Sequence, residues 1–126
     1  MVTTAETVLE ENASLLASGD AAGLAARYAP DARLVHAGGT ARGRIEIESL
    51  FAEQIRTRPR VESLETLGRS EDTVAYRARM RLDDTVVDVV GTIVLREGLI
   101  WRQTTVVVGE SSRGDEAHVS AIDGAG

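Results

Sequence analysis

Three side chains have the types and the sequence surroundings that acid–base chemistry on a small molecule would need. His36 closes a short alternating segment, and histidine is the side chain that changes its charge near neutral pH. Asp88 is a lone acid in a run of valines. Asn12 is an amide in the apolar stripe of a helical pattern, and an amide can donate to a developing oxyanion. Together they could abstract a proton and stabilise the resulting enolate.

Each of these residues also has a structural interpretation. His36 shares a strand face with Leu34, so it is either a histidine satisfied within the core or rim, or a pocket base. Asp88 is either a paired structural charge or a pocket acid. Asn12 lies either at the edge of the core or against a polar cavity, because a buried amide is costly without partners.

The N-terminal half must position Asn12 and His36. Thr3 and Glu6 form a capping box that opens a helix, and Gly19-Asp20 ends it and caps a second helix. The helical spacing continues to Tyr28 and stops at Pro30. Residues 31–37 are predicted to form a short strand, Gly38-Gly39 a turn, and residues 44–56 a third helix.

The C-terminal half reads as strands over residues 61–67, 73–82, 85–96 and 99–108. Residues 73–82 alternate cleanly, with arginines on one face. Residues 85–96 are apolar on both faces, which indicates a central strand covered on both sides. We expect the face with Asp88 to meet the cavity. The face with Val87, Val89 and Ile93 would then pack against a second subunit.

Four segments carry a resemblance to a known superfamily: Ser18-Gly19-Asp20, Tyr28-Ala29-Pro30-Asp31-Ala32, Gly43-Arg44-Ile45-Glu46-Ile47 and Arg96-Glu97-Gly98-Leu99-Ile100. Over roughly residues 4–108 the chain resembles the nuclear transport factor 2-like superfamily, in its SnoaL-like and steroid delta-isomerase-like branch. The resemblance implies an α+β cone, in which three N-terminal helices pack on a strongly curved, mostly antiparallel sheet around a blind cavity.

The resemblance also implies roles for residues. Asn12 falls where the steroid isomerases carry an oxyanion-stabilising tyrosine, and His36 where they carry a catalytic carboxylate base. Their second acid corresponds to Thr92, with Asp88 two pleats away on the same face. The expected substrate-binding residues are Tyr28, Phe51, Tyr76, Thr92, Trp101 and Gln103.

Composition excludes several classes of function. The net charge of −6 argues against nucleic-acid binding, and no apolar run reaches the length of a membrane span. All 14 cations are arginine and there is no cysteine, so neither a lysine Schiff base nor a thiolate site can form. His118 lies in a polar tail, which disfavours a metal site with His36. We expect a cytoplasmic protein without metal or cofactor, with one domain over residues 1–108 and a flexible tail over 109–126.

Two functions remain open. The first is a cofactor-independent acid–base enzyme acting on a small hydrophobic carbonyl compound, polyketide- or steroid-like, by isomerase, cyclase or dehydratase chemistry. The second is a non-catalytic, homodimeric module that binds a small hydrophobic molecule. They differ in whether His36, Asn12 and Asp88 converge on one cavity.

Overall fold

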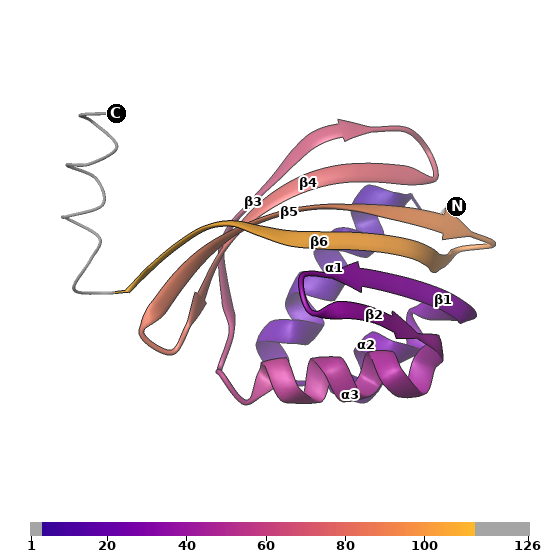
Figure 1. Ribbon diagram of the computed structural model, residues 1–126. Coiled ribbons are helices and arrows are strands. Elements are labelled where there is room, and N and C mark those ends of the chain that lie inside the picture. Colours follow the sequence, from indigo (N-terminus) through magenta and orange to yellow (C-terminus); the bar gives the residue numbers. More distant parts are fainter. Residues whose placement is uncertain (1–3, 113–126) are drawn as a thin grey trace.

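Three helices lie on one side of a curled six-stranded sheet (Figure 1). The computed structural model describes residues 4–112. Its elements are α1 (Ala5–Ser18), α2 (Ala21–Ala26), β1 (Tyr28–His36), β2 (Gly39–Arg42), α3 (Gly43–Ile55), β3 (Arg60–Arg69), β4 (Thr73–Leu82), β5 (Thr85–Arg96) and β6 (Leu99–Ser112). The predicted α+β cone is confirmed.

The sheet has the order β2-β1-β6-β5-β4-β3, and β1–β6 is its only parallel pair among the strands described. The two halves of the chain therefore meet where β1 adds to the edge of the β3–β6 meander. This pairing places the N-terminal strand beside the C-terminal strand, so side chains 75 residues apart come into contact across it.

Local side-chain contacts set the helix ends. Thr4 caps α1 by accepting from the N–H of Thr7 at 3.2 Å, and Gly19 ends it with a left-handed φ of 76°. Asp20 accepts from Gly23 N–H at 2.8 Å and caps α2. The N-cap is thus Thr4 and not Thr3, and the predicted capping box does not form. Its Glu6 instead accepts from Thr66 at 2.7 Å, which lowers the pKa of that carboxyl and ties α1 to β3.

Several predicted boundaries were wrong. The second helix ends at Ala26, and Tyr28 already begins β1, in which Pro30 occupies an exposed position at a register irregularity. The four residues of β2 were not predicted as a strand, since so short a strand carries no readable alternation. β6 continues to Ser112, beyond the predicted strand end at residue 108. The rest of the predicted tail, with His118, lies outside the described residues.

The two faces of β5 are the reverse of the prediction. Val87, Val89 and Ile93 lie opposite Met80, Ala78 and Val74, which belong to the buried core. Asp88 lies opposite Arg79, and Thr92 opposite Ala75, on the outer face. Because β5 is apolar on both faces, its own periodicity could not choose between them. The register of β5 with β4, which alternates strictly, determines which face of β5 is buried.

A β-bulge changes the facing of residues in β6. Leu95 pairs with Ile100, and Val94 pairs with Arg102, so Trp101 is the extra residue between them. Ile100 and Gln103 are consequently both buried, although they are three residues apart. Trp101 therefore does not share the inner face with Gln103, where the resemblance to the family had placed both residues.

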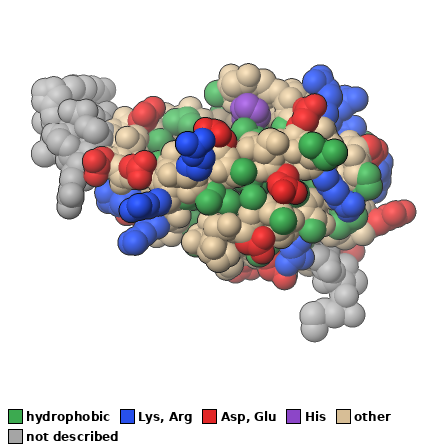
Figure 2. Space-filling view, turned by 90° about the horizontal axis from the view of Figure 1, so that it is seen from below, with side chains coloured by type: hydrophobic (Ala, Val, Ile, Leu, Met, Phe, Trp, Pro, Cys, Tyr) green, Lys and Arg blue, Asp and Glu red, His purple; other side chains and the backbone are tan. Residues whose placement is uncertain are grey.

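The helix side carries charges of both signs, with hydrophobic side chains among them (Figure 2). None of the helices within residues 4–112 combines the length and the apolar content needed to cross a membrane.

Candidate functional site

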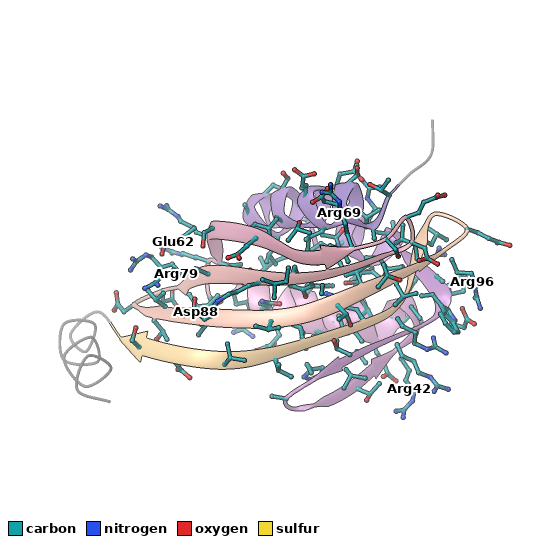
Figure 3. All side chains as sticks on the ribbon, turned by 90° about the horizontal axis from the view of Figure 1, so that it is seen from above. Arg42, Glu62, Arg69, Arg79, Asp88 and Arg96 are labelled. Atoms are coloured by element: carbon teal, nitrogen blue, oxygen red, sulfur yellow. The ribbon has the colours of Figure 1, made fainter. Side chains whose placement is uncertain are left out.

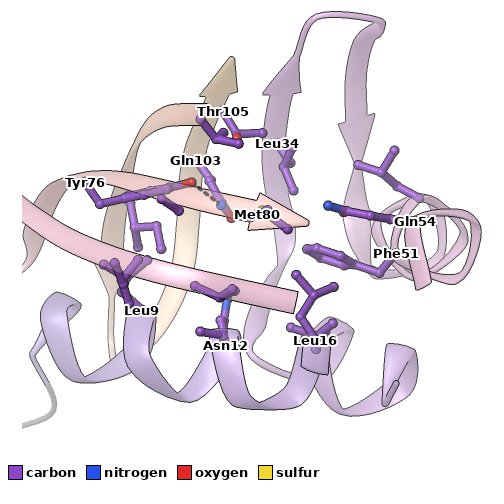
Figure 4. A pocket seen from close by; sticks show the side chains of 18 of the residues that line it. Leu9, Asn12, Leu16, Leu34, Phe51, Gln54, Tyr76, Met80, Gln103 and Thr105 are labelled. Carbon is purple, nitrogen blue, oxygen red and sulfur yellow. Dashed lines mark hydrogen bonds between the residues drawn. The ribbon is translucent and has the colours of Figure 1, made fainter. Parts of the chain in front are cut away.

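A cavity of about 110 Å³ lies between the helices and the inner face of the sheet. Its walls are mostly apolar and come from every part of the fold. Leu9 and Leu16 stand on α1, Phe51 on α3, Leu34 on β1 and Met80 on β4. Figure 4 shows these side chains arranged around the hollow. The helical stripe of α1 and the strand alternation of β4 thus point at the same space.

A chain of hydrogen bonds crosses three strands in the cavity wall. The hydroxyl of Tyr28 donates to Oε1 of Gln103 in a short contact, and Nε2 of Gln103 donates to the hydroxyl of Tyr76 at 3.1 Å. All three side chains are buried. Because Gln103 accepts at one end and donates at the other, it holds both phenols in fixed positions.

Gly91 makes this chain possible. It lies directly opposite Tyr76 on β5, between β4 and β6. A Cβ atom added at residue 91 would lie 2.2 Å from the carbonyl oxygen of Thr104 and 2.6 Å from the hydroxyl of Tyr76. The absent side chain therefore lets the Tyr76 ring extend across β5 to reach Gln103.

Burial raises the pKa of both phenols, which are neutral at neutral pH. Desolvation raises the pKa of Tyr28 well above its usual range, and the neighbouring Tyr76 raises it further. Burial also raises the pKa of Tyr76, against the opposing effect of its hydrogen bonds with Gln103 and Thr105. At neutral pH the cavity therefore presents phenols and amides rather than ions.

Asn12 has an incomplete set of partners. Its side chain is 9% exposed and lines the cavity from α1, between Leu9 and Leu16. Its Oδ1 atom is buried and has no hydrogen-bond partner among the described residues. In Figure 4 the amide points from the helix toward the side where Tyr76 and Gln103 meet. A buried amide left unpaired costs about 1–3 kcal/mol, so a group that paired with it would be stabilised there.

Two further polar residues line the cavity and were not predicted. Gln54 points inward from α3 (Figure 4), and Thr105 stands on β6. The sequence held a signal for each. Gln54 lies seven residues after Ile47, on the same helical stripe, and Thr105 follows Gln103 by two residues on the same strand face.

The structure brings part of the predicted site together. The predicted residues that line the cavity are Asn12, Tyr28, Phe51, Tyr76 and Gln103. Those outside its lining are His36, Asp88, Thr92 and Trp101. The three proposed catalytic residues therefore do not converge, since Asn12 alone among them reaches the cavity.

His36 lies beyond the cavity wall. It stands two residues after Leu34 on the same face of β1, at the β1–β2 turn, and is partly exposed. Its Nδ1 atom accepts from the backbone N–H of Gly38 at 3.1 Å. The predicted strand face is correct, but the strand carries the residue past the cavity into the hairpin.

Asp88 and Thr92 lie on the outer face of the sheet. A carboxylate oxygen of Asp88 is 3.9 Å from a guanidinium nitrogen of Arg77. The hydroxyls of Thr92 and Thr104 are hydrogen-bonded across strands at 2.7 Å. The predicted cavity positions of both residues are wrong, because they rested on the reversed faces of β5.

Trp101 packs between cations instead of lining the cavity. Its ring centroid is 3.9 Å from the guanidinium carbon of Arg102 and 5.1 Å from that of Arg96. The bulge in β6 produces this position. A bulge cannot be read from alternation, which it interrupts.

The lining has no acid, no base and no histidine among the residues described. Such a site can donate and accept hydrogen bonds, but it has no side chain placed to take a proton at neutral pH. Within residues 4–112, no group of three or more potential ligand side chains is placed to hold a metal ion.

Many solved structures are similar to this fold, and three of them illustrate the similarity. A protein from Sphaerobacter thermophilus superposes with a TM-score of 0.77 at 15% identity, covering 86% of this chain and 99% of that one. The epoxide hydrolase/cyclase-like enzyme SalBIII, described in pyran ring formation in the polyether salinomycin, superposes with a TM-score of 0.75 at 15% identity. The match covers 85% of this chain and 94% of that one. An NTF2-like protein of unknown function from Cytophaga hutchinsonii superposes with a TM-score of 0.69 at 12% identity. The match covers 85% of this chain and 91% of that one.

No curated protein matches the sequence. The model of the SnoaL-like domain matches residues 9–103, which include α1 from Leu9 onward and the strand with Gln103. The chain belongs to the SnoaL-like family of the NTF2-like superfamily.

Proposed function

We propose that the cavity binds a small, uncharged, mostly apolar molecule that carries at least one hydrogen-bonding oxygen. The observation behind this proposal is a buried amide oxygen without a partner, Oδ1 of Asn12, in a cavity whose other polar groups are all neutral. Because the unpaired Oδ1 is an acceptor, a ligand hydroxyl would donate to it, while a ligand carbonyl or ether oxygen would accept from the amide nitrogen.

The size of the cavity narrows the ligand class. An apolar cavity of about 150 Å³ holds benzene, so a volume of about 110 Å³ favours a molecule of one ring or a short branched chain. A steroid or a polyketide of several rings would need the helices to move apart. We therefore narrow the expected ligand to a compact ketone, lactone, cyclic ether or phenol.

The charge of the ligand follows from the same lining. A carboxylate brought into the cavity would lose its hydration without meeting a cation, and burying an unpaired ion is strongly unfavourable. A neutral carbonyl compound needs only one hydrogen bond. The protein should accordingly prefer a ketone to a carboxylate of the same shape.

Calorimetric titration with matched pairs tests this proposal. We expect cyclohexanone and phenol to bind at least about tenfold more tightly than cyclohexanecarboxylate and benzoate. Asn12→Leu should weaken binding of the neutral ligands while it raises the melting temperature, because it removes the unpaired amide.

Thr92→Val is the control, since Thr92 carries a polar group on the outer face of the sheet, outside the lining of the cavity. It should leave binding unchanged. Tighter binding of the carboxylates, or equal effects of the two substitutions on binding, would contradict the proposal.

A second candidate is catalysis without a cofactor, of cyclase, isomerase or dehydratase type, on the same class of molecule. The similarity to SalBIII, an epoxide hydrolase/cyclase-like enzyme, supports it. So does the hydroxyl of Tyr76, which accepts from Gln103 and keeps its own proton, because a neutral donor held in a dry wall can stabilise charge that develops on a substrate oxygen. His36 could take part only if the substrate reached past Leu34 to the hairpin.

Turnover of an epoxy-alcohol or an enolisable ketone by the variants tests this candidate. Tyr76→Phe should lower kcat by about 10² or more if Tyr76 stabilises the developing charge. His36→Gln should do the same if His36 is the base. If the wild-type protein binds these compounds without converting them, the result would contradict the catalytic function and remain consistent with the binding function.

We also propose that the protein forms a homodimer through the outer face of the sheet. Valines on neighbouring strands are exposed there, with Val35 and Val106 each 45% exposed, and Val90 and Val94 lie between them and β4. Sedimentation at micromolar concentration should give a dimer that Val106→Glu dissociates. A monomer at that concentration would contradict this assembly.

A further inference from the structure

Three arginines form a row across neighbouring strands at one end of the outer face. Arg42 on β2 pairs in register with Arg33 on β1, and Arg33 pairs in register with Arg102 on β6. Side chains at paired positions project from the same face of a sheet. With strands about 4.8 Å apart, the row extends over about 10 Å. We call Arg42, Arg33 and Arg102 the arginine row.

The arginine row lacks the acids that other outer-face arginines have. Within residues 4–112, neither Arg33 nor Arg42 forms an ion pair or a side-chain hydrogen bond from its guanidinium. Two carboxylates in this part of the chain are engaged elsewhere. Asp31 accepts from Arg96 at 2.6 Å, and Glu46 accepts from the backbone N–H of Arg42 at 2.8 Å.

The other end of the same face is neutralised. Arg81 and Arg79 both reach Glu62, with nitrogen–oxygen distances of 2.8 and 3.7 Å, and Arg77 faces Asp88. Figure 3 shows Glu62, Arg79 and Asp88 at one end of the sheet, and Arg42 and Arg96 at the other. In a chain of net charge −6, three arginines side by side are a local exception, and among the described residues the only electrostatic contact of this row with an acid is that of Arg102 with Asp31.

Contacts hold one member of the row in place. The guanidinium of Arg102 stacks on the ring of Trp101 and donates to the carbonyl oxygens of Trp101, at 2.9 Å, and Asp31, at 3.3 Å. Arg96, which also contacts the Trp101 ring, uses its charge on Asp31. An ordered guanidinium loses little entropy when it binds an anion.

We propose that the arginine row binds a compact polyanion, a molecule that carries two or more phosphate or carboxylate groups. Guanidinium groups match both kinds of group because they donate two parallel hydrogen bonds. A single anion would meet one or two of the arginines, whereas a polyanion meets all three. This site lies on the opposite face of the sheet from the cavity and does not depend on the ligand proposed for the cavity. Val94 pairs in register with Arg102, so the arginine row borders the valines of the proposed dimer interface and must stay accessible at its edge.

Calorimetric titration at low ionic strength, where exposed charges are least screened, tests the proposal. The probes are phosphate, pyrophosphate, tripolyphosphate and citrate. Affinity should rise with the number of phosphates, and the comparison of tripolyphosphate with citrate separates phosphate from carboxylate recognition. The double variant Arg33→Gln with Arg42→Gln should bind the preferred probe at least about tenfold more weakly.

The matched control is Arg77→Gln with Arg81→Gln, which makes the same change in net charge on the same face. It should keep the wild-type affinity. Equal losses in the two double variants would show attraction by bulk charge alone and overturn the proposal. So would the absence of binding to the wild type, or a dimer that dissociates only in the Arg33→Gln, Arg42→Gln variant, since the row would then contact a second copy.

A charge-conserving variant separates the guanidinium geometry from the charge. Arg33→Lys combined with Arg42→Lys keeps both positive charges but loses the two parallel donors of each guanidinium. This variant should keep the fold and bind the preferred probe with an affinity between those of the wild type and the glutamine variant. An affinity as low as that of the glutamine variant in a folded protein would contradict recognition by charge, and binding tighter than the wild type would contradict recognition by guanidinium geometry.

Discussion

The inner and outer faces of the sheet differ in the kind of polar groups they carry and in how those groups are paired. The inner face carries a few neutral groups, of which Tyr28, Gln103 and Tyr76 satisfy one another in a dry wall. The outer face carries arginines and acids in partial contact with water. Where water is excluded, an unpaired polar group strongly destabilises the fold. Where water is present, an ion pair adds little to the free energy of unfolding. Inner-face substitutions should therefore have large effects on folding and outer-face substitutions small ones.

The largest difference in the free energy of unfolding should appear between alanine substitutions at two glycines, Gly91 and Gly68. Gly91→Ala places a Cβ against the backbone carbonyl of Thr104 and the ring of Tyr76 on the inner face. Overpacking costs about 1–3 kcal/mol or more, and backbone cannot yield as a flexible side chain would. Gly68→Ala on β3 meets nothing within 4 Å and serves as the control. Urea denaturation should show a loss of about 3 kcal/mol or more for Gly91→Ala and little change for Gly68→Ala.

The next difference concerns adjacent residues of β6. Gln103→Leu leaves the buried hydroxyl of Tyr28 without its acceptor, at a cost of about 1–3 kcal/mol in the free energy of unfolding. Thr104→Val removes the exposed hydrogen bond to Thr92 and should cost well under half as much. Equal losses in denaturation experiments would mean that burial does not separate the two faces.

High pH should act on the inner face alone. The folded-state pKa values of Tyr28 and Tyr76 are raised, so stability is complete below about pH 10, the unfolded value. Above it the unfolded chain loses protons that the folded chain keeps. The free energy of unfolding should then fall by up to about 1.4 kcal/mol per pH unit for each tyrosine, until the folded-state pKa is reached.

The composition makes this measurement clean, because the chain has no lysine or cysteine to titrate in the same range. Tyr28→Phe should reduce the slope of stability against pH by about one proton. A flat profile from about pH 9 to about pH 11 in the wild type, a range that brackets the reference value for tyrosine, would contradict the burial of the phenols.

The smallest effects are expected on the outer face, with opposite signs at its two ends. Glu62→Gln removes the acid that faces Arg81 and Arg79 and should lower the free energy of unfolding by about 0.2–1 kcal/mol. Arg33→Gln relieves like charges and should raise it by a similar amount. Thermal unfolding at low salt measures both. A loss of stability in Arg33→Gln would mean that the arginine row is structural.

The elements and the class of fold follow from local signals in the sequence. Capping residues, the helical stripes and the alternation of residues 73–82 are such signals, and the structure has three helices and a mostly antiparallel sheet as expected. The same periodicities placed Asn12, Phe51 and Tyr76 on faces that do line the cavity, whereas Gln103 was placed there by the family register and Tyr28 lies on a strand and not on the predicted helix. Local spacing is enough where a helix or strand has one clearly apolar face.

The positions of the charged candidates depend on contacts between distant segments. β5 is apolar on both faces, so its register with β4 turned Asp88 and Thr92 outward, and a bulge in β6 moved Trp101. His36 shares a face with Leu34, but the length of β1 carries it beyond the cavity. The arginine row has the same origin, since residues 33, 42 and 102 become neighbours when β1 joins β2 and β6. Strand register, bulges and cavity depth arise when the strands assemble, and no local pattern encodes them.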